Sequence, residues 1–270
     1  MESRINEIWY ALKAKASVEE LAFLKKCFRA YSSKGHLANV KADLQFMYRM
    51  SPPPQRVLDF GCGIGLQAYL LAHAGYEVYG LETIEDKSLE GFLKGKAETH
   101  IKTRDESMKN VWDVIRTRQK VEFGFYDGVV IPYQDGLFNA VVAYAVVEHI
   151  PPAEVNGVMK EINRVLKKGG LFYIFQLPQR SSYTEFIARN LGWESHEYLW
   201  SLSEIRKALK IGGFDVLKCE KADMVINHPY QVINPVFGLL KIVNRFLIHT
   251  PLSYFAHHLT AIAQKPSAGS

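Results

Sequence analysis

The segment Val57-Leu58-Asp59-Phe60, followed by glycines at positions 61, 63 and 65, constrains the fold more than any other part of this chain. Its mostly apolar residues predict a short buried strand, and the glycines permit positive φ angles in a tight turn. The spacing of 66–74 predicts a helix that begins at this turn. Because the first amides of a helix lack partners, such a turn favours a phosphate or carboxylate. A plain strand-to-helix connection is the alternative interpretation.

Two details narrow the ligand of this turn. The dinucleotide fingerprint requires glycine at position 66, where the chain has Leu66, and this disfavours a nicotinamide oxidoreductase. Glu82 ends a second predicted strand about twenty residues after the turn. A carboxylate at this position can accept hydrogen bonds from both hydroxyls of a ribose. The pattern therefore favours a ligand that contains a ribose.

Strands alternate with helices through most of the chain after residue 54. Helices are predicted between the strands, for example over 152–166 and 203–211. This alternation predicts an α/β fold with a doubly wound, mostly parallel, seven-stranded Rossmann-like sheet, whose ligands bind at the carboxyl ends of the strands. The predicted strands are Arg56–Phe60, Glu77–Leu81, Val121–Tyr126, Asn139–Ala145, Leu171–Gln176, Phe214–Cys219 and His258–Gln264.

Three stretches lie outside this alternating core. Helical spacing over 5–30 and 38–50, with a polar turn over 31–36, precedes a stop at Ser51-Pro52-Pro53-Pro54. The polar stretch 85–120 predicts a solvated helix, and an apolar segment over 220–257 separates the last two strands. We expect one domain, 1–270, made of an N-terminal helical lid (1–50), a cofactor-binding core (51–219), a substrate cap (220–257) and a last strand (258–265).

The composition restricts the partners of the chain. Lys and Arg number 33 against 28 Asp and Glu, and this net charge of +5 is too small for a dedicated nucleic-acid binder. The three cysteines are far apart and the histidines scattered, so we expect a reduced cytoplasmic compartment and no metal site. The chain shows neither a signal peptide nor an apolar run of about 18 residues, which leaves at most a peripheral membrane contact.

Five segments in sequence order, 57–65, 78–83, 125–133, 137–150 and 166–171, resemble the motifs of class I S-adenosylmethionine-dependent methyltransferases. The likeness is to the small-molecule type of ubiquinone and menaquinone biosynthesis, although Asn139 stands where the family usually has Asp. It implies S-adenosylmethionine as cofactor and S-adenosylhomocysteine as product. By the same resemblance, the cofactor-binding residues are Asp59, Gly61, Cys62, Gly63 and Gly65 for the methionine part, Glu82 for the ribose, Asp127 and Gly128 for the adenine, and Ala145 beneath the methyl group.

Candidates on the acceptor side follow from their places in the chain. His149 comes after the fourth strand and is a candidate general base near pH 7, or else a histidine packed at a helix start. Tyr31 and His36 lie in the turn that folds over the cofactor in similar enzymes. His196 and Tyr198 follow the fifth strand, where substrate loops usually lie. For these four residues ordinary surface polarity is the alternative.

The apolar segment 236–248 carries Lys241, Arg245 and, one residue beyond it, His249 at i, i+4 and i+8. This spacing places the basic groups on one face of a helix. Such a helix could lie on a membrane surface, cover an apolar substrate pocket or pack within the core.

The sequence thus predicts an enzyme that moves a sulfonium methyl group in line to an oxygen, nitrogen or carbon of a small molecule, apolar or lipid-linked. A catalytically silent S-adenosylmethionine-binding module with a regulatory or assembly role is the alternative. A nucleic-acid methyltransferase is disfavoured, because Ala143-Tyr144-Ala145-Val146 stands where an Asn-Pro-Pro-Tyr-like motif is expected. The acceptor atom and the oligomeric state stay open.

Overall fold

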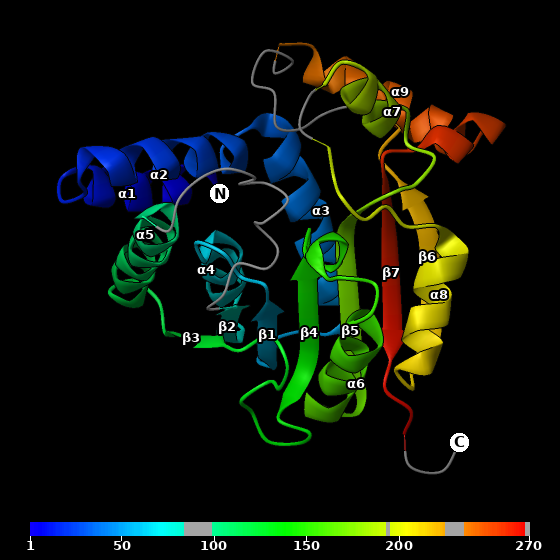
Figure 1. Ribbon diagram of the computed structural model, residues 1–270, viewed down its shortest axis with the longest axis horizontal. Coiled ribbons are helices and arrows are strands. Elements are labelled where there is room, and N and C mark those ends of the chain that lie inside the picture. The colour runs from blue at the N-terminus through cyan, green and yellow to red at the C-terminus, as the bar shows by residue number, and fades with distance from the viewer. Residues whose placement is uncertain (84–98, 193–194, 225–234, 268–270) are drawn as a thin grey trace.

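Seven strands form one sheet in the order β3-β2-β1-β4-β5-β7-β6 in the computed structural model, which describes residues 1–83, 99–192, 195–224 and 235–267 (Figure 1). Neighbouring strands from β3 to β5 are parallel, whereas β7 runs antiparallel to both β5 and β6. The doubly wound, mostly parallel sheet is therefore confirmed. The strands are β1 (Arg56–Phe60), β2 (Glu77–Thr83), β3 (Val121–Tyr126), β4 (Phe138–Tyr144), β5 (Leu166–Pro178), β6 (Asp215–Ala222) and β7 (His258–Gln264).

Helices cover both faces of this sheet. Side chains of α1 to α5 share one buried apolar cluster with one face, and those of α6 and α8 share a second cluster with the other. The helices are α1 (Glu2–Lys13), α2 (Val18–Tyr31), α3 (Lys34–Met50), α4 (Leu66–His73), α5 (Thr99–Arg116), α6 (Val155–Val165), α7 (Tyr183–Asn190), α8 (Leu202–Ile211) and α9 (Phe237–Leu247), with 3-10 helices η1 (Val147–His149) and η3 (Pro251–Phe255).

The order of the strands reverses between β1 and β4. The chain builds β1, β2 and β3 outward in one direction and then returns to place β4 on the other side of β1. The loops that leave β1 and β4 therefore separate at their carboxyl ends and leave room for a ligand. This point in the sheet positions the candidate site.

The N-terminal helices differ from the sequence expectation at their ends. The helical spacing over 5–30 is interrupted after Lys13, and Ser17 caps α2 in a capping box with Glu20. The prediction of a polar turn over 31–36 is wrong for residues 34–36, which are helical. The Ser33 side chain accepts the amide of His36 and starts α3 at Lys34, so His36 is a buried helical residue.

The helix α5 is not the solvated helix that its polar composition predicts. Met108, Val111, Trp112 and Ile115 recur every three or four residues and are buried. The amide of Asn110 donates to Glu20 of α2 at 2.6 Å, so α5 joins the N-terminal helices to the sheet. The part of that prediction that falls on 85–98 lies outside the described residues.

The helices α7 and α9, which follow β5 in the chain, also differ from the sequence expectation. The helix α7 has no counterpart among the predicted elements. In α9 no residue is buried, so the alternative of a helix packed within the core is wrong. None of the helices in the described parts of the chain is both long and apolar enough to cross a membrane.

Candidate active site

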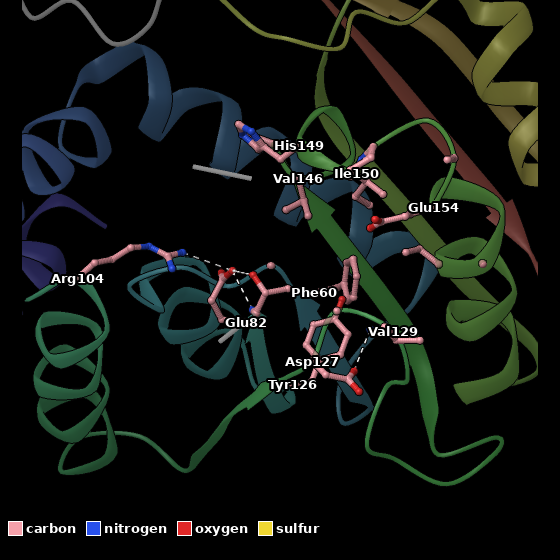
Figure 2. Close-up of a pocket in the computed structure, with 18 of the residues that line it drawn as sticks. Phe60, Glu82, Arg104, Tyr126, Asp127, Val129, Val146, His149, Ile150 and Glu154 are labelled. Carbon is pink, nitrogen blue, oxygen red and sulfur yellow. Dashed lines mark hydrogen bonds and ion pairs between the residues drawn. The ribbon is translucent and has the colours of Figure 1, made fainter. Parts of the chain in front are cut away.

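A cavity of about 620 Å³ opens at the carboxyl ends of the strands around the β1–β4 reversal (Figure 2). Its walls come from the ends of β1, β2, β3 and β4, from η1 and from the start of α6. Single side chains from α2 and α5 complete it. This volume is typical of sites for cofactors and drug-sized ligands.

The glycine turn after β1 is held by the backbone of the neighbouring strand. The amides of Gly61 and Cys62 both donate to the Leu81 carbonyl of β2, at 2.8 and 3.1 Å. Gly61 and Gly63 have φ angles of +72° and +51°, where only glycine is free of strain. A Cβ on Gly61 would lie 2.6 Å from a side chain of the β4 loop, whereas one on Gly63 would meet open space. Gly61 is therefore packed closely against the β4 loop, whereas the space beside Gly63 is open.

Glu82 connects this turn to the cavity. Its side chain is buried and lines the cavity wall at the end of β2. One carboxylate oxygen accepts the Gly63 amide at 2.7 Å and the other accepts the Thr83 amide at 3.1 Å. The Thr83 hydroxyl also donates to that second oxygen, at 3.3 Å, so about one of the four lone pairs of the carboxylate remains for a ribose hydroxyl.

Asp59 and Cys62 lie behind the cavity wall. Asp59 is 1% exposed, and its Oδ2 has no hydrogen-bond partner among the described residues. Burial, together with the charge of Glu82, raises its pKa to about 7. Burial also raises the pKa of the Cys62 thiol, which makes it a packing residue and not a nucleophile. Neither residue lines the cavity, and the same holds for Gly63 and Gly65.

Asp127, Gly128 and Ala145 all line the cavity. Asp127 follows β3, and its Oδ1 accepts the amides of Val129 and Val130 at 2.9 and 3.0 Å (Figure 2). These two hydrogen bonds lower the pKa of the carboxyl group. They also fix its orientation, so Oδ2 is available to a ligand. Ala145 sits directly after β4 with a positive φ of 54°, a conformation that non-glycine residues rarely adopt.

Two residues of the wall come from helices that no local motif marks. Arg104 of α5 is 12% exposed, and its guanidinium lies 3.6 Å from Glu82 (Figure 2). Phe23 of α2 also lines the cavity. Sequence reasoning missed both, because only the packing of α2 and α5 on the sheet brings them there. The buried face of α5 would have been the signal for Arg104.

On the β4 side, η1 brings His149 to the cavity wall. Its side chain is 47% exposed. Partial burial of the ring disfavours the charged form, and this effect, followed by the charge of His196, lowers the pKa of His149 to about 4. The imidazole is therefore neutral at pH 7 and can accept a proton. Its ring centre lies 6.4 Å from that of His196.

Glu148, next in the chain to His149, is a feature that sequence reasoning missed. It is 1% exposed, and neither carboxylate oxygen has a hydrogen-bond partner within the described part of the chain. Burial raises its pKa to about 7. One of these oxygens lies 4.0 Å from Nε2 of His149. A polar group this deeply buried is costly, and such groups gather at functional sites.

The other acceptor-side candidates form two separate groups outside the cavity wall. His196 pairs with Glu185 of α7 at 2.7 Å, which holds the pKa of His196 above its usual value despite burial. The ring centre of His36 lies 4.7 Å from that of Tyr31 and 5.7 Å from that of Tyr144, the residue before Ala145. Neither group lines the cavity, and neither does Tyr198. The described residues contain no cluster of His, Cys, Asp or Glu that could hold a metal ion.

Comparison with known proteins agrees with this geometry. A family model described as a methyltransferase domain matches residues 34–218. A sterol 24-C-methyltransferase of Gibberella zeae is 32% identical over 46% of this chain and 28% of its own length. A ubiquinone biosynthesis O-methyltransferase of Rhizobium rhizogenes is 28% identical over 60% of each protein. The chain thus spans less than two thirds of either relative.

Solved structures show the same fold. A phosphoethanolamine N-methyltransferase of Haemonchus contortus, in complex with S-adenosyl-L-methionine, superposes with a TM-score of 0.54 at 19% identity, over 84% of this chain and 53% of the other. The Glu82 and Asp127 carboxylates line the cavity and suit the ribose and adenine of that cofactor, whereas Gly63 is not among the residues that line it. The chain belongs to the methyltransferase domain family, as a class I S-adenosylmethionine-dependent methyltransferase.

Proposed function

We propose that this protein transfers a methyl group from S-adenosylmethionine to a small, apolar or lipid-linked acceptor. The observation that carries the proposal is a single cavity at the β1–β4 reversal, which joins Glu82 and Asp127 to an uncharged histidine, His149. The relatives named above methylate a sterol and act in ubiquinone biosynthesis. Both names point to acceptors with extensive apolar surface.

On the cofactor side, the chain's own groups bind and orient. Glu82 accepts a hydrogen bond from the ribose, and Oδ2 of Asp127 accepts one from the adenine amine. The Arg104 guanidinium is the cationic group beside the glycine turn, and we assign it to the carboxylate of the methionine part. When bound, the cofactor supplies an electrophilic sulfonium methyl group.

On the acceptor side, the wall is largely apolar. Val146, Ile150 and Val158 line it beside His149. Apolar walls hold an apolar acceptor and keep water from competing for the methyl group. His149, which is uncharged at pH 7, then accepts the proton of an acceptor hydroxyl as the oxygen attacks.

Two measurements test the proposal in sequence. Titration calorimetry with S-adenosylmethionine and S-adenosylhomocysteine should give micromolar binding, and no binding at millimolar ligand would overturn the cofactor assignment. Transfer of labelled methyl groups is then compared for an isoprenoid quinol, a sterol and a water-soluble catechol. Transfer to either apolar acceptor supports the proposal, and transfer to the catechol alone overturns the acceptor class. Cofactor binding without transfer to any acceptor would favour the catalytically silent module.

A further inference from the structure

An exposed apolar surface is formed by side chains of α7, α9 and η3, and Figure 1 shows α7 and α9 at the end of the molecule where β4 and β5 reach their carboxyl ends. We call it the α7–α9 face. It combines residues of α7, its C-cap Leu191, α9 and η3 that are more than half exposed: Phe186 (69%), Leu191 (57%), Leu239 (63%), Ile242 (57%), Phe246 (71%) and Tyr254 (58%). Water-exposed patches of large apolar side chains mark interaction sites in soluble domains.

Polar contacts anchor this face to the rest of the protein. The hydroxyl of Ser181 and the amide of Gln179, both between β5 and α7, donate to the Tyr254 carbonyl. Thr184 at the start of α7 hydrogen-bonds to His257, just before β7. The amide of Met224, after β6, donates to Asn244 of α9. The three elements are therefore held to the sheet by their polar groups while their large apolar side chains stay in water.

The helix α9 turns its most apolar residues outward. Leu240 and Leu247 are partly buried, whereas Leu239, Ile242 and Phe246 are exposed and recur every three or four residues. A helix of a globular protein normally shows the opposite distribution. Helices that lie in a membrane interface bury such a face among lipid chains.

The charge of this region identifies the partner. Residues 235–257, which include α9 and η3, contain no Asp or Glu, while Lys241 and Arg245 lie on exposed turns of α9. The Lys221 ammonium lies 5.6 Å from the ring centre of Tyr254. In α7, the one acidic residue, Glu185, is buried and paired with His196. Apolar side chains flanked by cations match a bilayer with anionic headgroups, because basic side chains near its surface are attracted to the negative surface potential.

We propose that the α7–α9 face docks on the surface of an anionic lipid bilayer, with Phe246 and Leu239 inserted among the acyl chains and Lys241 and Arg245 at the headgroups. This inference goes beyond the proposed function and does not rest on it. The face lies at the same edge of the sheet as the cavity. Docking would bring that edge to the membrane whether or not the acceptor is itself a lipid.

Co-sedimentation with vesicles tests the proposal on the full chain. The protein should bind vesicles of phosphatidylcholine that contain about a third phosphatidylglycerol, an anionic lipid, at least tenfold more tightly than vesicles of pure phosphatidylcholine. Added salt should weaken binding to the anionic vesicles. The double variant Leu239→Ser/Phe246→Ser should lose binding by at least tenfold. The control variant Val18→Ser/Tyr10→Ser removes equally exposed residues, 84% and 68%, from the N-terminal helices and should bind like the wild type.

Charge reversal and oligomeric state complete the test. Lys241→Glu/Arg245→Glu should abolish the preference for anionic vesicles. Absence of vesicle binding, or equal loss in the control variant, overturns the proposal. A dimer that dissociates in Leu239→Ser/Phe246→Ser, without vesicle binding, would overturn it in favour of a second copy of this chain. Calorimetry with S-adenosylhomocysteine on the same variants reports on the cofactor site separately, so failure of either inference is recognised independently.

Discussion

The two walls of the cavity are built in different ways. The wall from β1, β2 and β3 is made of backbone amides and of carboxylates whose hydrogen bonds come from residues close to the strand ends, as in Glu82 with Gly63 and Asp127 with Val129. The wall from η1 presents His149, and behind it Glu148 has no hydrogen-bond partner in the described structure. The groups that line the first wall have hydrogen-bond partners before any ligand binds, whereas Glu148, behind the second wall, has none within the described ranges. Asp59, behind the first wall, also has one oxygen without a partner among the described residues.

This difference separates binding from chemistry. Groups that are already satisfied and rigid bind a constant ligand at low entropic cost. Buried groups without partners raise the free energy of the folded state, and proteins retain such groups mainly where they act. We therefore expect changes on the cofactor wall to alter affinity and changes on the η1 wall to alter turnover or pH dependence.

The largest effect is expected from His149→Ala. Loss of a general base lowers turnover by about 10²–10⁴-fold, while the affinity for S-adenosylhomocysteine should stay within about twofold because the cofactor wall is intact. Initial rates and calorimetry on the same preparation check this. A folded variant with full turnover would remove His149 from the mechanism.

The pH profile distinguishes His149 from its neighbour. The pKa of His149 is lowered to about 4. Because the range from pH 6 to pH 8 lies about two or more units above that pKa, a His149 base stays neutral there and turnover should not change with pH. Glu148 has its pKa raised to about 7. A rise in turnover through pH 7 that disappears in Glu148→Gln would therefore show that ionisation of Glu148, behind the wall, controls turnover.

The two glycines of the turn provide a matched pair on the cofactor wall. Alanine at either position costs about 1–2 kcal/mol for its positive φ. At Gly61 the new Cβ would also lie 2.6 Å from Val146, and overpacking adds about 1–3 kcal/mol. Denaturant unfolding should therefore show a greater loss of stability for Gly61→Ala than for Gly63→Ala. Equal losses would mean that the turn relaxes away from Val146.

The buried Glu148 should make stability depend on pH. In the folded protein the carboxyl group keeps its proton up to about pH 7, whereas in the unfolded chain it ionises near 4.5. Between these values the folded state binds more protons, so its stability falls as the pH rises. Because Gln cannot ionise, Glu148→Gln should gain on the order of 3 kcal/mol relative to the wild type between pH 4 and pH 8. Denaturant unfolding at both pH values measures this gain. The same difference in unfolding free energy between variant and wild type at pH 4 and at pH 8 would contradict the prediction.

The same contrast explains what the sequence could predict. The glycine turn, Glu82 and Asp127 lie within a few residues of strand ends, so local pattern and family resemblance located them. Arg104 reaches the cavity only through the packing of α5, and the pKa of Glu148 depends on neighbours far away in sequence, among them His196. The outward apolar face of α9 is a further case, since spacing alone does not tell which side of a helix meets the core.

On the cofactor wall, Glu82→Ala should have a modest effect on cofactor affinity. Loss of its hydrogen bond to the ribose should weaken cofactor binding by about 1–3 kcal/mol, and Glu82→Gln by less, since one oxygen acceptor remains. Glu82 also accepts the Gly63 amide, so the variant could act through the turn instead of the ribose. Calorimetry with S-adenosylhomocysteine and with its 2′,3′-dideoxy analogue separates these causes. A loss confined to the natural ligand assigns the carboxylate to the ribose hydroxyls. An equal loss for both ligands shows that Glu82 acts by holding the glycine turn, which would move the ribose site away from β2.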